Sequence, residues 1–212
     1  PTGADALVAR VVRGGLMAGV PAVACFALVR GRARFALGLA AVLLAGLLDP
    51  GPHGKTLLVE RNFFGTLRVT ESPDGRTVLL VHGTTRHGQQ RVGERDRPTP
   101  LMYYHPTGPV GRLFEKLPGD RPRRVAAVGL GCGAMAHYAR PGDSWAFFEI
   151  DPAVARVARD ERYFTFLSTC QAPVRVVLGD ARRQLLRETD GAFDLIVLDA
   201  FSSDAIPTHL LT

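Results

Sequence analysis

The chain has 212 residues, of which 46% are hydrophobic and 22% are charged, and its formal net charge is +6. This length accommodates one full domain, a smaller domain and a membrane segment. The positive charge comes mainly from scattered arginines, without a basic helix or interleaved aromatic residues, so it does not indicate a nucleic-acid partner.

The N-terminal residues 1–49 contain two apolar runs, 16–29 and 35–48, which are separated by the basic segment 30–34. Both runs are shorter than the roughly 18 to 20 residues of a typical bilayer span. The flanking arginines can extend them by snorkelling toward the membrane surface. We therefore expect membrane helices here, with a pair of buried helices in a soluble domain as the alternative.

Residues 50–100 are expected to form a small β-rich domain. The segments 56–60, 64–70 and 77–82 are typical of strands, and Ser72-Pro73-Asp74-Gly75 is typical of a turn.

Four apolar runs follow in the segment 101–212, and each is typical of a buried strand: 125–129, 145–149, 174–178 and 193–198. The first leads into three alternating glycines, whereas the other three are followed by acids. Open α/β sheets bind ligands at the carboxyl ends of their strands. We predict a Rossmann-like nucleotide-binding domain of the α/β class, incomplete at its C-terminus.

The glycine turn after the first strand admits two interpretations. Gly129, Gly131 and Gly133 let the backbone approach a ligand and adopt positive φ angles. The pattern Gly129-x-Gly131-x-x-Ala134 also satisfies the dinucleotide fingerprint. A dinucleotide site depends mainly on this turn and one ribose acid, whereas acids follow all three later strands here. We therefore predict an S-adenosylmethionine-dependent methyltransferase fold and keep a nicotinamide site as the alternative.

The acids are assigned by their positions after the strands. Glu149 is placed to accept hydrogen bonds from both ribose hydroxyls of the cofactor, and Asp180 is placed to accept one from the adenine amino group. Asp199 lies at the reacting end. A helix cap is the alternative for such acids, and we prefer it for Asp151, which precedes Pro152.

In this order, the motifs resemble those of the spermidine synthase (polyamine aminopropyltransferase) family. The resemblance is closer to bacterial members fused to a multi-pass membrane segment, and it extends from about residue 57 to residue 212. The segments that carry it are Glu60-Arg-Asn-Phe-Phe-Gly-Thr-Leu-Arg-Val69, His82-Gly83, His87-Gly88-Gln89, Tyr103-Tyr104-His105-Pro106, the glycine turn, Phe148-Glu149-Ile150-Asp151, Gly179-Asp180-Ala181 and the segment from Leu198-Asp199 to Asp204-Ala-Ile-Pro207.

The resemblance implies transfer of an aminopropyl group from decarboxylated S-adenosylmethionine to a diamine such as putrescine. It implies that Asp199 takes the proton of the attacking amine and that Tyr104 helps to orient this amine. It also places Asp204, His105 and Gln89 at the substrate, with Asp204 holding the distal ammonium.

Three departures from the family pattern keep other functions open. Cys132 stands where soluble spermidine synthases have an aspartate that pairs with the aminopropyl ammonium, and Pro106 replaces a carboxylate of the amine pocket. Asp199 and Asp204 are two residues further apart than in the family. The alternatives are methyl transfer from S-adenosylmethionine and a non-catalytic, membrane-tethered module that binds a nucleotide or a polyamine.

The remaining expectations concern location, partners and metals. We expect a bacterial inner-membrane protein whose catalytic domain faces the cytoplasm, because the cofactor is supplied there. Its partners would be a small-molecule amine and membrane lipid, and a homodimer stays open. The three cysteines and six histidines are dispersed without ligand spacing, so we expect neither a disulfide nor a metal site.

Overall fold

The computed structural model describes residues 31–48, 54–83 and 85–200, together with the isolated residues 19, 21, 23 and 26. Its contacts divide the chain into two compact units, Pro1–Gly51 and Pro52–Thr212.

The first unit contains helix α3, Arg32–Leu48, with 17 residues. Its leucines are unusually exposed, since Leu37, Leu43 and Leu44 show 71%, 61% and 58% of their surface. None of the helices within the described ranges combines the length and the apolar character that a bilayer span requires. The other predicted membrane segment, 16–29, lies almost wholly outside the described residues.

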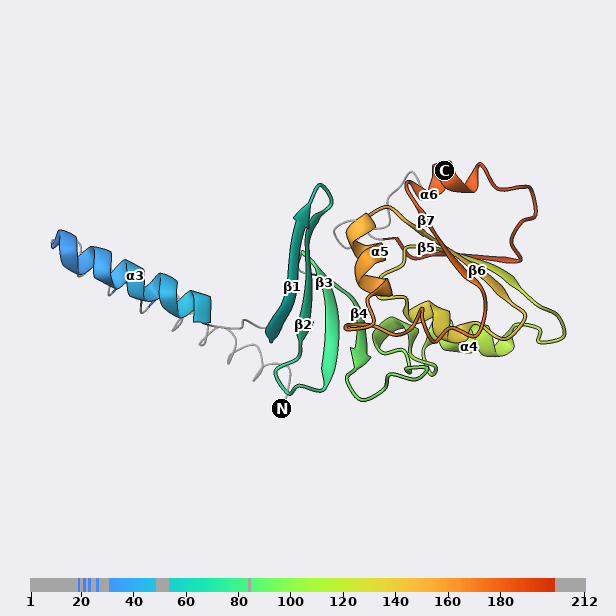
Figure 1. The fold of residues 1–212 in the computed structure, drawn as a ribbon, viewed down its shortest axis with the longest axis horizontal. Coiled ribbons are helices and arrows are strands. Elements are labelled where there is room, and N and C mark those ends of the chain that lie inside the picture. The colour runs from blue at the N-terminus through green and yellow to red at the C-terminus, as the bar shows by residue number, and fades with distance from the viewer. Residues whose placement is uncertain are drawn as a thin grey trace. The chain divides into compact units, whose positions relative to one another are not determined.

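The second unit begins with an antiparallel sheet whose strands are adjacent in chain order (Figure 1). They are β1 (Lys55–Asn62), β2 (Gly65–Glu71), β3 (Thr77–His82) and β4 (Thr85–Arg91). The turn predicted between β2 and β3 is present, because the Asp74 carboxylate accepts hydrogen bonds from the Ser72 hydroxyl and the Arg76 N–H. The first three strands were predicted. The fourth was missed because Thr-Arg-His-Gly-Gln-Gln-Arg has no apolar alternation.

The parallel sheet that follows contains β5 (Arg124–Val128), β6 (Ser144–Glu149), β7 (Val174–Leu178) and β8 (Leu195–Leu198). Its order is β7-β6-β5-β8, and all three neighbouring pairs are parallel. The Rossmann-like α/β prediction is therefore confirmed. The chain moves outward from β5 through β6 to β7 and then returns to the other side of β5. The carboxyl ends of β5 and β8 thus form the switch point where open α/β sheets bind ligands.

At least one helix packs on each face of the parallel sheet, although Ile196 and Leu198 of β8 stay exposed. Helix α5 (Pro152–Arg159) belongs to the larger hydrophobic cluster, whereas α6 (Ala181–Leu185) packs against the smaller cluster on the opposite face. The segments before and after β5 contribute the 3₁₀ helix η2 (Met102–Tyr104), helix α4 (Pro109–Lys116) and the 3₁₀ helix η3 (Ala134–Tyr138).

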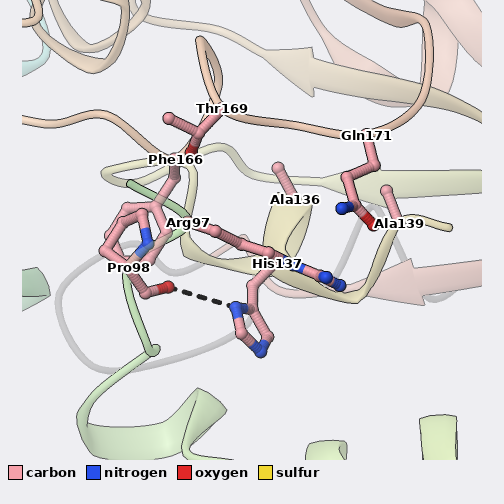
Figure 2. A pocket seen from close by; sticks show the side chains of 8 residues that line it. All are labelled: Arg97, Pro98, Ala136, His137, Ala139, Phe166, Thr169 and Gln171. Atoms are coloured by element: carbon pink, nitrogen blue, oxygen red, sulfur yellow. Dashed lines mark hydrogen bonds between the residues drawn. The ribbon is translucent and has the colours of Figure 1, made fainter. Parts of the chain in front are cut away.

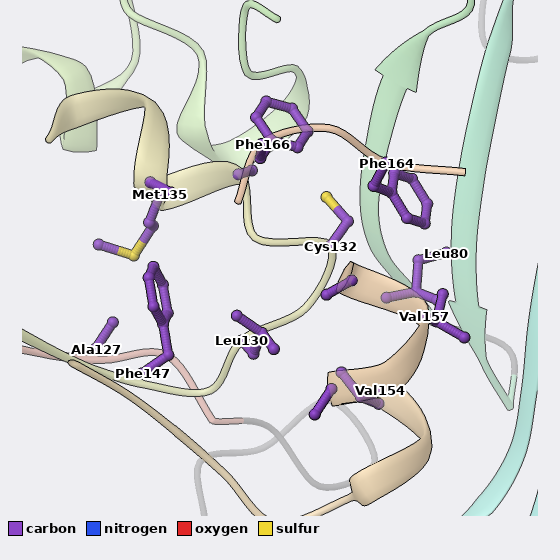
Figure 3. Close-up of a cluster of buried hydrophobic side chains, with 14 of the residues drawn as sticks. Leu80, Ala127, Leu130, Cys132, Met135, Phe147, Val154, Val157, Phe164 and Phe166 are labelled. Atoms are coloured by element: carbon purple, nitrogen blue, oxygen red, sulfur yellow. The ribbon is translucent and has the colours of Figure 1, made fainter. Parts of the chain in front are cut away.

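The two sheets share one hydrophobic core. Leu80 of β3 lies in the same cluster as Phe147 of β6, Val157 of α5 and Phe164 (Figure 3). The domain boundary predicted near residue 100 therefore falls within a single compact unit. This common core fixes the antiparallel sheet against the glycine turn, which positions the candidate site.

The amino end of the parallel sheet is held by a buried ion pair. The Arg123 guanidinium lies 3.1 Å from the Asp143 carboxylate, and both side chains are at least nine-tenths buried. Asp143 also accepts hydrogen bonds from the backbone N–H groups of Arg123 and Arg140. These donors hold the pKa of Asp143 below its usual value, although burial opposes them. This end of the sheet serves a structural role, opposite the edge that carries the candidate site.

Candidate functional site

The glycine turn follows β5 and is closely packed on two sides. Gly129 and Gly131 have φ angles of +96° and +55°, in the region that favours glycine. A Cβ atom at Gly129 would lie 2.5 Å from the Asp199 carbonyl oxygen, and one at Gly131 would lie 2.6 Å from the His87 carbonyl oxygen. The turn is thus enclosed between the end of β8 and strand β4. The prediction that these glycines adopt positive φ angles is confirmed, whereas their contact with a ligand stays a prediction.

Glu149 ends β6, and its carboxylate binds the glycine turn. One oxygen accepts a hydrogen bond of 3.0 Å from the Leu130 N–H, and the other accepts one of 2.9 Å from the Asp151 N–H. The residue is only 8% exposed, and burial raises the pKa of its carboxyl group, although these backbone donors oppose the shift. Each carboxylate oxygen has a further lone pair that can accept a ribose hydroxyl.

The acids Asp151 and Asp180 both cap helices. Asp151 accepts a hydrogen bond of 2.8 Å from the Ala153 N–H at the start of α5, which confirms its interpretation as a cap. Asp180 accepts one of 2.9 Å from the Arg183 N–H at the start of α6. Asp180 is half-buried at the end of β7, so its predicted contact with adenine stays a prediction beside the observed cap.

Asp199 directly follows β8, and its N–H donates a hydrogen bond of 2.8 Å to the Val128 carbonyl of β5. Its side chain is partly buried, and burial raises the pKa of its carboxyl group to about 6. A carboxylate with this pKa is ionised at neutral pH and holds a proton more firmly than an exposed aspartate. It therefore suits general-base chemistry near neutral pH.

The structure gathers these predicted residues along one edge of the parallel sheet. The glycine turn, Glu149, Asp180 and Asp199 follow the four strands β5, β6, β7 and β8 at their carboxyl ends. This edge combines a tight turn with three carboxylates, which suits a cationic ligand that also carries hydroxyl groups.

The remaining predicted site residues come from other elements. Tyr104 ends η2 with its side chain against the core, and its carbonyl accepts a hydrogen bond from the Tyr138 hydroxyl. The imidazole of His105 lies 2.9 Å from the Thr107 hydroxyl, and Gln89 lies in β4. Asp204 lies outside the described residues.

Cys132 lies in the glycine turn but does not face a ligand. Its side chain is 1% exposed and belongs to the cluster that includes Leu80, Val157 and Phe164 (Figure 3). Burial raises the pKa of the thiol to about 12, despite hydrogen bonds from the backbone of Ala134 and Gln89. The thiol is therefore neutral and enclosed, and it cannot pair with a ligand ammonium.

Two hollows elsewhere in the described part of the chain are less suited to a nucleoside. One lies among Arg97, Pro98, His137 and Phe166, where the imidazole of His137 is 3.1 Å from the Pro98 carbonyl (Figure 2). It has no interior volume that a water molecule could occupy. The other, of about 260 Å³, includes Arg124 at the amino end of the parallel sheet. Both lie apart from the carboxylates.

The described residues contain no group of three or more histidine, cysteine, aspartate or glutamate side chains placed to hold a metal ion. Sequence reasoning assigned no role to the Leu130 N–H or to Asn62, whose amide donates to Asp151. A backbone donor leaves no signal in a sequence, and a single asparagine in a turn has an ordinary local explanation.

Comparison with known proteins supports the resemblance. The chain is 30% identical, over 181 residues, to a curated polyamine aminopropyltransferase of Vibrio vulnificus (strain CMCP6), with 80% of this chain and 57% of that protein covered. No family model matches the chain.

Solved structures with a similar fold include a probable spermidine synthase from Corynebacterium glutamicum ATCC 13032, with 19% identity and a TM-score of 0.56 over 76% of this chain and 57% of that one. The spermidine synthase from Thermotoga maritima has 16% identity and a TM-score of 0.47, over 74% and 50%. The chain spans just over half the length of its curated relative.

Proposed function

Because this chain is related to the polyamine aminopropyltransferases, we propose that it transfers an aminopropyl group from decarboxylated S-adenosylmethionine to a diamine such as putrescine. One observation carries the proposal most directly. The backbone carbonyl of Asp199 packs against Gly129 at the switch point of the parallel sheet, and burial raises the pKa of its side-chain carboxyl group to about 6. A general base is thus held beside the turn over which such sheets bind nucleosides.

The residues at this edge fit the proposed cofactor. The glycines at 129 and 131 let the turn pack tightly between β8 and β4 at the carboxyl end of the sheet, which places its backbone at the switch point where such sheets bind nucleosides. The free lone pairs of Glu149 can accept the two ribose hydroxyls, and Asp180 can accept the adenine amino group. Carboxylates also favour a cationic sulfonium electrostatically.

The chemical step requires little acid catalysis. The amine nitrogen attacks the carbon next to the sulfonium, so a C–N bond forms while the C–S bond breaks. The electron pair of the broken bond goes to sulfur, which becomes a neutral thioether. The amine must reach the carbon unprotonated at its attacking nitrogen, and Asp199 would take the proton. In this proposal, Tyr104, His105, Gln89 and Asp204 position the diamine.

Methyl transfer from S-adenosylmethionine remains a second candidate, because of one specific observation. The neutral, enclosed thiol of Cys132 provides no countercharge for an aminopropyl ammonium at the glycine turn. Preference for the decarboxylated cofactor must therefore come from groups other than this thiol.

A turnover assay by mass spectrometry distinguishes these functions. The full-length protein is incubated with putrescine and either decarboxylated or ordinary S-adenosylmethionine. We expect spermidine and methylthioadenosine from the decarboxylated form, and both products at a rate at least about 10²-fold lower from an Asp199→Asn control. A methylated amine and S-adenosylhomocysteine would instead establish methyl transfer, and absence of any product with either form would support a non-catalytic binding module.

We also propose that the first unit attaches the protein to a bacterial inner membrane, with the catalytic unit in the cytoplasm. The two apolar runs, their flanking arginines and the exposed leucines of α3 support this location. Membrane lipid would then be a second partner besides the amine. We expect the full chain to sediment with inner-membrane vesicles and a chain without residues 1–49 to lose this association. A full chain that stays in the supernatant would contradict the proposal.

A further inference from the structure

A continuous chain of hydrogen bonds runs from the antiparallel sheet to the glycine turn. The amide of Asn62, the last residue of β1, donates to an Asp151 carboxylate oxygen at 2.7 Å. The Asp151 N–H donates to one oxygen of Glu149 at 2.9 Å. The other oxygen of Glu149 accepts from the Leu130 N–H at 3.0 Å. Asn62 is therefore connected to the turn through the carboxylate that we assign to the ribose.

The side chain of Asn62 is itself fixed in orientation. Its carbonyl oxygen accepts a hydrogen bond of 2.8 Å from the Phe64 N–H, within the turn between β1 and β2. With the oxygen held in this way, the NH₂ group of the same amide points at Asp151. The turn thus presents a donor of defined direction to a residue 89 positions further along the chain.

Asp151 depends on this donor because it is buried and short of partners. It is only 3% exposed. One of its oxygens accepts from both Asn62 and the Ala153 N–H, whereas the other is buried without a hydrogen-bond partner within the described residues. A buried carboxylate with two donors on one oxygen loses half of its hydrogen bonds if Asn62 is removed, and this loss is costly at a buried charge.

We propose that Asn62 is a positioning residue for the nucleoside ribose, because it holds Asp151 and thereby sets the orientation of the Glu149 carboxylate beside the glycine turn. This inference rests on the proposed function, which assigns the ribose to Glu149. If the backbone at Asp151 shifts when this donor is lost, the Asp151 N–H and the Glu149 oxygen that accepts from it move as well. The Glu149 carboxylate then has the wrong orientation to bind the ribose diol, although residue 149 is not substituted.

The chain offers a matched control in the same two elements. Glu60 lies two residues before Asn62 in β1 and forms an ion pair with Arg156 of α5. This pair also joins β1 to α5, but it is much more exposed and has no hydrogen bond to Glu149. Glu60→Gln therefore weakens the same junction without touching the proposed chain to the ribose.

The test measures recognition of the ribose rather than overall binding. Calorimetry compares the affinities of methylthioadenosine and its 2′-deoxy analogue for the full chain, for Asn62→Ala and for Glu60→Gln. We expect the unaltered chain to prefer the ribose ligand by about tenfold or more, the scale of a hydrogen bond to a charged group. In Asn62→Ala this preference should fall to about threefold or less, whereas Glu60→Gln should retain it.

A second variant controls for disturbance of the turn between β1 and β2. Asn62→Asp can still accept from the Phe64 N–H but removes the donor to Asp151, so it should lose the ribose preference as Asn62→Ala does. Equal weakening of both ligands, or an unchanged preference in both variants, would overturn the inference, because a merely structural residue gives these results. A chain that binds neither ligand would refute the proposed site and with it the inference. Ribose-selective binding without aminopropyl transfer would refute only the proposed function.

Discussion

Replacement of Asp199 by asparagine is expected to lower turnover by about 10²- to 10⁴-fold, the usual contribution of a general base. Asparagine cannot take the proton of the attacking amine, but it has nearly the same shape. The backbone bond from residue 199 to Val128 does not involve the side chain and should persist. Nucleoside affinity, measured by calorimetry, should therefore stay within about twofold. Equal losses of affinity and turnover would make Asp199 a binding residue instead.

The same substitution has an expected pH signature in turnover. Burial raises the pKa of Asp199 to about 6, so the base is protonated and inactive well below this pH. Turnover of the unaltered chain should rise as pH increases through about 6, and Asp199→Asn should lack this limb. Initial rates at substrate concentrations well below KM, between about pH 5 and pH 8, measure it, because kcat/KM reports the pKa of the free enzyme.

The contribution of Asp199 to the free energy of unfolding should fall as pH rises, whereas turnover should increase. The pKa of Asp199 is higher in the folded chain than the roughly 3.9 of an unfolded aspartate, so folding favours the protonated form. The associated stability is complete below about pH 4 and is lost as pH rises through about 6. At pH 7.5 we expect Asp199→Asn to be more stable by about 1 to 2 kcal/mol, after discounting for partial exposure, with little difference at pH 4. Urea unfolding at both pH values measures this, and an equal offset at both would contradict the assignment.

The fold was predictable where burial controls the sequence pattern. The central strands β5 and β6 are buried on both faces, so they appear as apolar runs such as Trp145-Ala-Phe-Phe. The outer strands β7 and β8 are only half-buried but keep a mainly apolar pattern. Strand β4 escaped detection because its two buried positions are Gly88 and Gln90 rather than apolar residues. A Cβ atom at Gly88 would fall 2.2 Å from the Cys132 sulfur, so close packing selected glycine there rather than an apolar side chain.

The candidate site was predictable in residue identity but not in its connections. Acids at strand ends pointed to Glu149 and Asp199 because parallel strands bring their carboxyl ends to one edge. That Glu149 binds the Leu130 N–H depends on the exact path of the turn, which no residue type specifies. The bond from Asn62 to Asp151 joins positions 89 residues apart, and only the packing of the two sheets creates it.

These hydrogen bonds give Glu149 a structural role in the glycine turn, in addition to the ribose-binding role that we propose. Its carboxylate satisfies the two backbone donors at Leu130 and Asp151, and under the proposed function its remaining lone pairs accept the ribose hydroxyls. The folded state must therefore tolerate a carboxylate whose pKa burial has raised. The two backbone hydrogen bonds that offset part of the cost of burial also fix the orientation of the carboxylate.

Glu149→Ala is therefore expected to have two separable effects. Nucleoside binding should weaken by about 1 to 3 kcal/mol, because hydrogen bonds from the ribose hydroxyls to a charged group are lost. Independently, the free energy of unfolding should fall by about 2 to 4 kcal/mol, because the buried N–H groups of Leu130 and Asp151 lose their acceptor. Calorimetry with methylthioadenosine measures the first effect and urea unfolding without ligand measures the second. Glu115→Ala, at an exposed acid of α4, is the control and should change neither quantity by more than about 0.5 kcal/mol.

Glu149→Gln separates the two effects further, because glutamine preserves the volume of the side chain. One of its terminal atoms is an NH₂ group, which meets a backbone N–H where the carboxylate had an acceptor. At least one of the bonds to Leu130 and Asp151 must therefore break, so glutamine should recover only part of the lost stability. Affinity for methylthioadenosine should remain below that of the unaltered chain. A Glu149→Gln chain as stable as the unaltered one would show that the carboxylate does not hold the glycine turn, and undiminished affinity would remove Glu149 from the ribose site.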